Sequence, residues 1–161
     1  MRILFSALLL LPMLSACAEE EAPAPPPVPD PAVVALLEAL EYDWESEDNG
    51  DFRLLFDVDG TRTQLVWIRN RTYERDDVVM RDVWSTALEL SGKYASVKLA
   101  DLLLRSNWER IIGTWAREGN RIVYMVKLPV NATSEQLDAA IGVVIDEADR
   151  LEKERGYGDK F

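Results

Sequence analysis

The amino-acid sequence predicts an α+β fold, because helical and strand periodicities occur in blocks and not as alternating βαβ units. Apolar residues recur at helical spacing near both ends of residues 32–161. Between these ends lie two hairpin signals, Asp59-Gly60 and Glu118-Gly119-Asn120. The expected order is a helix, three antiparallel strands, a helix, a two-strand hairpin and a long C-terminal helix packed on one sheet.

The first half of this order follows from a change of period. After Pro31, the helical spacing is carried by Val33, Leu36, Leu37, Leu40 and Trp44. Residues 45–51 are a polar break, and apolar residues then alternate from Phe52 to Val58 as in a strand. Asp59-Gly60 predicts a tight turn into a second strand that contains Trp67. Residues 70–77 read as a charged connection, and residues 78–90 as the third strand.

The second half begins with a short helix over residues 96–105, for which Ser96 is a plausible N-cap. Residues 110–116 and 121–130 flank the second hairpin signal, and alternation in the latter run predicts a strand that ends near Pro129. Thr133 or Ser134 then caps the long final helix. Its stripe at 3.6-residue spacing consists of Leu137, Ile141, Val144, Ile145, Ala148 and Leu151.

The first 17 residues have the pattern of an export signal. Arg2 provides a positive start, and the apolar run that follows is shorter than the roughly 20 residues of a membrane-spanning helix. Leu14-Ser15-Ala16-Cys17 resembles the lipobox of bacterial lipoproteins, which predicts a signal peptide over residues 1–16 and lipid attachment at Cys17. The alternative is an ordinary secretory signal in which Cys17 stands by chance.

Residues 17–31 are acidic and contain six of the eight prolines of the chain, which predicts an extended tether. The domain proper is then expected over residues 32–161. In bacterial sorting signals, an Asp directly after the lipidated Cys retains a lipoprotein in the inner membrane. This chain has Ala18 at that position, so the resemblance implies an outer-membrane location facing the periplasm.

Composition excludes several functions. The chain of 161 residues has 29 acidic and 18 basic side chains, no His and one Cys, and its net charge is -11. The absence of His removes Ser-His-Asp catalysis and His-ligated metal sites, and one Cys cannot form an internal disulfide. An acidic chain also repels phosphate backbones, so nucleic acid is not an expected partner. No cofactor or metal is expected.

The element order, together with the strings Leu54-Leu55-Phe56-Asp57-Val58-Asp59-Gly60 and Gly113-Thr114-Trp115, resembles the YbjN-type domain and the related class I type III secretion chaperones. Residues 121–129 and the closing helix through residues 148–152 belong to the same pattern. The resemblance covers residues 31–156 approximately. It implies an antiparallel sheet packed against helices, often dimeric, that binds other proteins and has no known catalytic centre.

The string from Leu54 to Thr61 also resembles the first motif of haloacid dehalogenase-type phosphotransferases. In that reading Asp57 is the nucleophile, Asp59 is the acid and base, and Mg2+ lies between them. That family places the motif on a parallel strand followed by a helix. Here the following residues read as a second strand, so Asp59-Gly60 is predicted to be a hairpin turn and the Mg2+-dependent phosphatase remains the alternative.

Five tryptophans are a large number for a domain of this size, and an exposed Trp is a favoured anchor for binding partners. Trp84 and Trp115 are the candidates for exposure, because charged neighbours suggest a sheet edge. The sequence thus predicts a non-enzymatic, membrane-tethered domain of the cell envelope that binds a protein or peptide of unknown identity, with a homodimer possible. A structural envelope lipoprotein is a further alternative.

Overall fold

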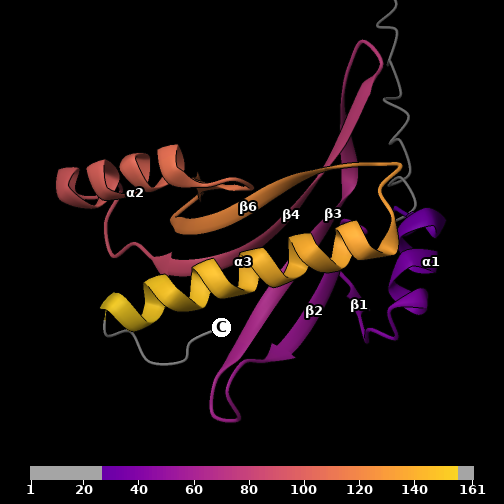
Figure 1. The fold of residues 1–161 in the computed structure, drawn as a ribbon, viewed down its shortest axis with the longest axis horizontal. Helices are drawn as coiled ribbons and strands as arrows, with labels where there is room; N and C mark the ends of the chain where they lie inside the picture. The colour runs from indigo at the N-terminus through magenta and orange to yellow at the C-terminus, as the bar shows by residue number, and fades with distance from the viewer. Residues whose placement is uncertain (1–26, 156–161) are drawn as a thin grey trace, which may run out of the picture.

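A computed structural model describes residues 27–155, in which three helices are separated by two runs of strands that form one antiparallel sheet (Figure 1). The elements are α1 (Pro31–Ala39), β1 (Glu45–Ser46), β2 (Phe52–Asp57), β3 (Thr63–Arg75), β4 (Val78–Glu89), α2 (Val97–Glu109), β5 (Thr114–Glu118), β6 (Arg121–Pro129) and α3 (Ser134–Arg155). The predicted α+β class and the long C-terminal helix on the sheet are therefore confirmed.

The strand order across the sheet is β1-β2-β3-β4-β6-β5, so β1 and β5 are its edges. The helix α3 crosses one face and contacts β3, β4 and β6, whereas α2 contacts β5 and α1 contacts α3 (Figure 1). The core lies between α3 and this face, and it contains the fully buried side chains of Phe52, Val66, Tyr124 and Ile141.

Alternation along the strands separates this covered face from an open one. On β3, Val66 and Ile68 are fully buried toward α3, and Trp67 between them points to the opposite face. Trp84 of β4 pairs with Trp67 in the ladder and shares the open face. The open face therefore carries aromatic side chains that α3 does not cover.

Each helix begins at a side chain that accepts a backbone hydrogen bond. The carboxylate of Asp30 accepts from Ala32 N at 2.9 Å, and Ser96 Oγ accepts from Leu99 N at 3.2 Å. Before α3, Thr133 Oγ1 accepts from Gln136 N at 3.3 Å while Gln136 Oε1 accepts from Thr133 N at 3.0 Å. This reciprocal capping box selects Thr133 of the two predicted caps.

Three local expectations were wrong. Residues 70–75 continue β3 as part of a long hairpin with β4, whose turn is Asp76-Asp77. This part of the strand was not predicted because both of its faces are largely exposed, so its sequence is charged and shows no apolar alternation. The polar break contains the short strand β1, and α1 ends at Ala39, so that Trp44 lies beyond it and packs on Phe52 with ring centroids 4.9 Å apart.

Candidate functional site

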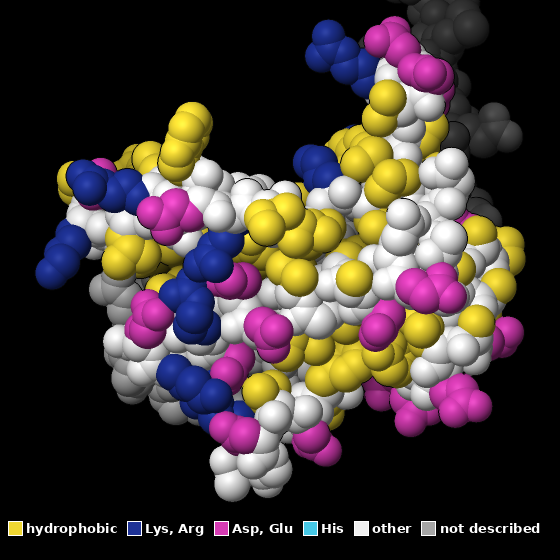
Figure 2. All heavy atoms as spheres, viewed as in Figure 1, with side chains coloured by type: hydrophobic (Ala, Val, Ile, Leu, Met, Phe, Trp, Pro, Cys, Tyr) yellow, Lys and Arg dark blue, Asp and Glu magenta, His cyan; other side chains and the backbone are white. Residues whose placement is uncertain are grey.

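The helix α2 carries apolar side chains on two sides. Leu99 and Leu103 face inward and are 8% and 7% exposed. The outward side has a stripe of large apolar residues that are exposed by more than two thirds, which we call the α2 stripe: Val97, Leu104, Trp108 and, just beyond the helix end, Ile111. Trp108 is 91% exposed. Figure 2 shows hydrophobic side chains projecting from this helix. Large exposed apolar groups that gather in one place typically mark an interaction surface.

The stripe is presented by a helix that is fixed to the edge strand β5. Asn107 Oδ1 accepts from Trp115 N at 2.6 Å, and Asn107 Nδ2 donates to Trp115 O at 3.3 Å. The indole Nε1 of Trp115 donates to Ser106 Oγ at 3.2 Å. Because these bonds join the inward side of α2 to a strand, the outward stripe has a defined orientation.

Charged side chains beside the stripe alternate in sign along α2: Lys98, Asp101, Arg105 and Glu109. Asp101 and Arg105 form an exposed ion pair with Oδ2 and Nε 3.0 Å apart. The helix is thus locally neutral on a chain whose net charge is -11. An approaching macromolecule would meet apolar surface bordered by both signs of charge and no net repulsion from the helix itself.

The predicted exposure of Trp84 and Trp115 was wrong, since each is only 6% exposed. Trp84 lies on β4, an interior strand of the sheet, where its ring stacks on Trp67 with centroids 4.5 Å apart. Trp115 does lie on an edge strand, yet its side chain turns into the core and its ring meets Tyr124 edge to face. Charge did not mark exposure here: Arg81 and Asp82, next to Trp84, are themselves only 4% exposed and form ion pairs with Asp30 and Lys127.

The α2 stripe was not predicted, although the sequence contains a signal for it. Leu104, Trp108 and Ile111 have the i, i+4, i+7 spacing of one helical side. The helix was expected to end at residue 105, so Trp108 fell outside it. In the structure α2 extends to Glu109, and this final turn places Trp108 on the exposed side.

Asp57 and Asp59 lie at the antiparallel hairpin that the sequence predicted. Asp57 ends β2 and pairs with Thr63, and Val58 N donates to Arg62 O at 2.8 Å across the turn. The chain doubles back after Gly60, which differs from the parallel strand and following helix of the phosphotransferase motif. The predicted turn is confirmed, and the architecture that the phosphatase alternative requires is not the one formed here.

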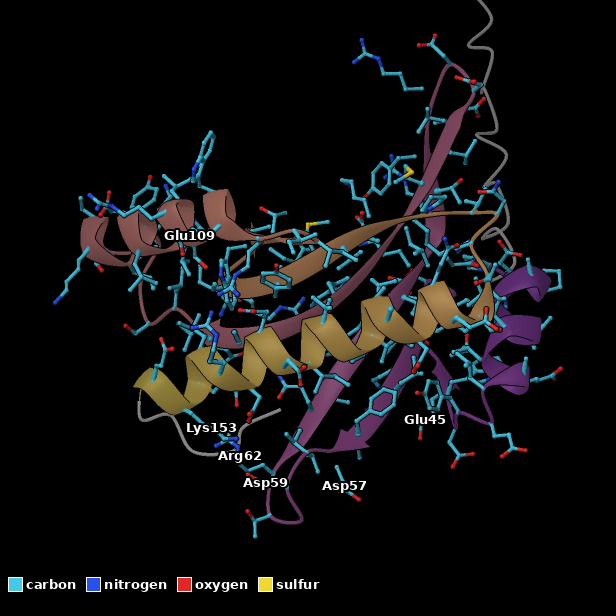
Figure 3. All side chains as sticks on the ribbon, in the orientation of Figure 1. Glu45, Asp57, Asp59, Arg62, Glu109 and Lys153 are labelled. Carbon is cyan, nitrogen blue, oxygen red and sulfur yellow. The ribbon has the colours of Figure 1, made fainter. Side chains whose placement is uncertain are left out.

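The Asp59 carboxylate is engaged within the hairpin and with α3. It accepts from Thr61 Oγ1 at 3.0 Å and lies 3.6 Å from Lys153 Nζ (Figure 3). The hydrogen bond from Thr61 is the main reason why the pKa of Asp59 is lowered below its usual value. These contacts stabilise the carboxylate in its charged form and tie the turn to the final helix.

The structure contains no group of three potential metal-binding side chains from His, Cys, Asp and Glu within residues 27–155. Cys17, the predicted signal peptide and most of the predicted tether lie outside the described residues, so the structure does not test them. None of the helices in the described part has the length and apolarity needed to cross a bilayer.

Comparison with known proteins gave one family. Residues 30–154 match the model of the YbjN family, which carries the description "Putative bacterial sensory transduction regulator". No curated protein matched the chain. The family match spans every helix and strand except the last residue of α3.

Proposed function

The chain belongs to the YbjN family, and on that premise we propose that it is a non-enzymatic protein-binding domain that docks through the α2 stripe. The observation that carries this proposal is the 91% exposure of Trp108 beside Leu104 and Ile111 on a helix fixed to the sheet. Trp is one of the residues enriched among those that dominate protein interfaces, and truncating such an anchor typically costs about 2 kcal/mol or more of binding free energy. A regulatory domain acts by binding, which agrees with the family description.

The occupant that the charges of α2 favour is a second copy of the chain. In an antiparallel pair of α2 helices related by a two-fold axis, the order of charges reverses from one helix to the other. Lys98 near the start of one helix then approaches Glu109 near the end of its partner, and Asp101 approaches Arg105. The same arrangement covers both apolar stripes.

Crosslinking from position 108 tests the docking surface. A photoreactive phenylalanine analogue replaces Trp108 in cells that produce the protein, and the matched control carries it in place of Leu55, which is 63% exposed but lies on β2. We expect a discrete adduct of twice the chain mass from position 108 and none from position 55.

A discrete adduct with a different protein would support docking at the stripe and exclude the second copy as its occupant. No adduct from position 108 would contradict the docking function and would favour a structural envelope protein. Sedimentation of the purified protein provides a second measurement, in which Trp108→Ser should abolish concentration-dependent dimerisation and Leu55→Ser should not.

We also propose that the protein is held at the envelope membrane by lipid on Cys17, on the outer membrane facing the periplasm. The support is the lipobox pattern of residues 14–17 and the proline-rich stretch after it. Two or more acyl chains give stable anchoring, whereas one is marginal. Labelling with a fatty-acid analogue should mark the parent protein, and Cys17→Ala should lose both the label and the membrane fraction. A labelled Cys17→Ala variant would show that the lipid is elsewhere.

A further inference from the structure

A cavity of about 500 Å³ lies on the open face of the sheet, away from both α3 and the α2 stripe. Its lining residues come from across the sheet, from one edge to the other: Asp48 and Asp51 from the β1–β2 loop, Trp67 from β3, Trp84 from β4, Glu118 from β5 and Arg121 from β6. Arg69 of β3 reaches Glu118 of the edge strand β5 at 3.0 Å. The open face is therefore concave, because residues from the two edges line one space.

The floor of this cavity is a stacked aromatic pair with an arginine above it. The rings of Trp67 and Trp84 are 4.5 Å apart and inclined by 12°. The guanidinium carbon of Arg121 lies 4.9 Å from the centre of the Trp84 ring and 5.8 Å from that of Trp67. This cation–π contact holds the guanidinium in place without using its N–H groups.

Arg69 Nε has no hydrogen-bond acceptor among the described residues, although its guanidinium bonds Glu118 through Nη2. Donors of two further lining residues, Arg121 and Trp84, also have no acceptor there. Arg121 makes no side-chain hydrogen bond or ion pair with the described residues, so its planar fork of N–H groups is free. Trp84 is 94% buried, since only 6% of it is exposed, and its Nε1 has no hydrogen-bond partner. A buried N–H without an acceptor costs about 1–3 kcal/mol.

The acidic groups of the lining divide into engaged and free ones. Glu47 pairs with Arg53 Nε at 3.1 Å and Glu118 pairs with Arg69. Asp51 accepts from Asn49 Nδ2 at 2.9 Å and from Asn70 N at 2.7 Å. Asp48, in the loop opposite the arginine, makes no such contact with the described residues. The cavity thus has one free cation, Arg121, and one free anion, Asp48, among its described lining residues.

We propose that this cavity binds a small amphoteric ligand, a free amino acid or a short peptide, whose carboxylate pairs with Arg121 and whose ammonium group faces Asp48. A carboxylate accepts two parallel hydrogen bonds from a guanidinium, which is the strongest form of this contact. The volume is in the range of small-molecule sites. This site is separate from the proposed docking surface, and neither proposal depends on the other.

The test measures binding of L-alanyl-L-alanine and of L-alanine to the purified full-length protein, up to about 10 mM. Tryptophan fluorescence reports binding, because the indoles of Trp67 and Trp84 form the floor. Two analogues probe the charges on the unaltered protein: the dipeptide amide lacks the carboxylate and the N-acetyl dipeptide lacks the ammonium group. We expect each loss to raise the Kd at least about tenfold.

Arg121→Gln should raise the Kd for the unmodified ligand by a similar factor. Its matched control is Arg117→Gln in the same hairpin, whose Nε donates to Gly119 O and which does not line the cavity. Tighter binding of the dipeptide would indicate that the ligand is a short peptide, and tighter binding of alanine would indicate a free amino acid. The proposal is overturned if neither compound binds. It is also overturned if the dipeptide amide binds as well as the dipeptide, or if Arg121→Gln leaves the Kd unchanged. The analogue measurements use the parent protein and remain decisive if a variant fails to fold.

Discussion

Arg62, in the turn between β2 and β3, donates from Nε to Oδ1 of Asp149 on α3 at 2.8 Å. Its Nη2 reaches Oε2 of Glu152 at 3.0 Å, and the side chains of the two acidic residues are only 9% and 1% exposed. Replacing Arg62 by Met would leave two buried carboxylates with reduced compensation. We expect Arg62→Met to lower the free energy of unfolding by about 3 kcal/mol, measured by urea denaturation.

The control for this variant is Arg75→Met at the exposed end of β3, which should change stability by less than about 0.5 kcal/mol. Equal effects of the two substitutions would show that the buried ion pairs do not hold the hairpin to α3.

A second prediction concerns the attachment of α2 to β5. The side-chain amide of Asn107 bonds the backbone of Trp115 with both its oxygen, which accepts from Trp115 N, and its nitrogen, which donates to Trp115 O. Asn107→Ala removes these bonds and leaves the Trp115 N–H without its acceptor, so stability should fall by about 1–3 kcal/mol. Thermal denaturation measures the effect, and Asp101→Ala on the exposed side of the same helix serves as the control. A loss no larger than that of the control would contradict the role of Asn107.

The covered face of the sheet was accessible to sequence reasoning, whereas the surfaces were not. The period of two places Val66 and Ile68 on one face of the strand and Trp67 on the other, and the structure shows that the first two belong to the core. The same reasoning could not decide whether Trp84 faces solvent, because its burial depends on Trp67 and Arg121, which reach it from other strands. The concave open face likewise results from the curvature of the whole sheet. The α2 stripe was missed for a local reason, namely a helix end placed one turn too early.

The hairpin geometry predicts the outcome of a phosphatase assay. Asp57 ends β2 and Asp59 lies within the turn to the antiparallel strand β3. The Asp57→Asn variant should therefore hydrolyse p-nitrophenyl phosphate with Mg2+ at the same background rate as the parent protein. The measurement requires both proteins from one purification protocol. Clear turnover by the parent that Asp57→Asn abolishes would restore the catalytic alternative.

Stability should fall at alkaline pH. Tyr42 OH donates to Asp138 Oδ1. This hydrogen bond is the main cause, and burial the second, of a pKa of Tyr42 that lies above its usual value of 10.0. The pKa of Lys153 is likewise raised above 10.5, mainly by its hydrogen bond to Asp149. A raised pKa means that the folded state favours the protonated form, so this stabilisation is complete below the unfolded pKa and disappears as pH rises through the folded pKa.

We therefore expect the urea midpoint to decrease from about pH 8 to about pH 11, and Tyr42→Phe to show a smaller decrease because it has no proton to lose at this position. A parent protein whose midpoint is constant over this range would contradict the prediction. A variant with the same slope as the parent would assign the effect to other groups.

The last prediction concerns Gly113, which precedes β5 with a φ of +81°. A Cβ added there would clash with Cε1 of Tyr124, a side chain that is fully buried and whose OH donates to Ile112 O at 2.7 Å. Gly113→Ala therefore adds a steric clash with a fixed ring to the strain of positive φ, and it should lower the unfolding free energy by at least about 2 kcal/mol. Gly119→Ala is the matched control, because Gly119 has a φ of +59° and open space around its added Cβ. That variant should lose only about 1 kcal/mol, since it carries the backbone strain alone. The difference between the two urea denaturation curves measures the clash, and equal losses would show that the Tyr124 ring moves aside at little cost.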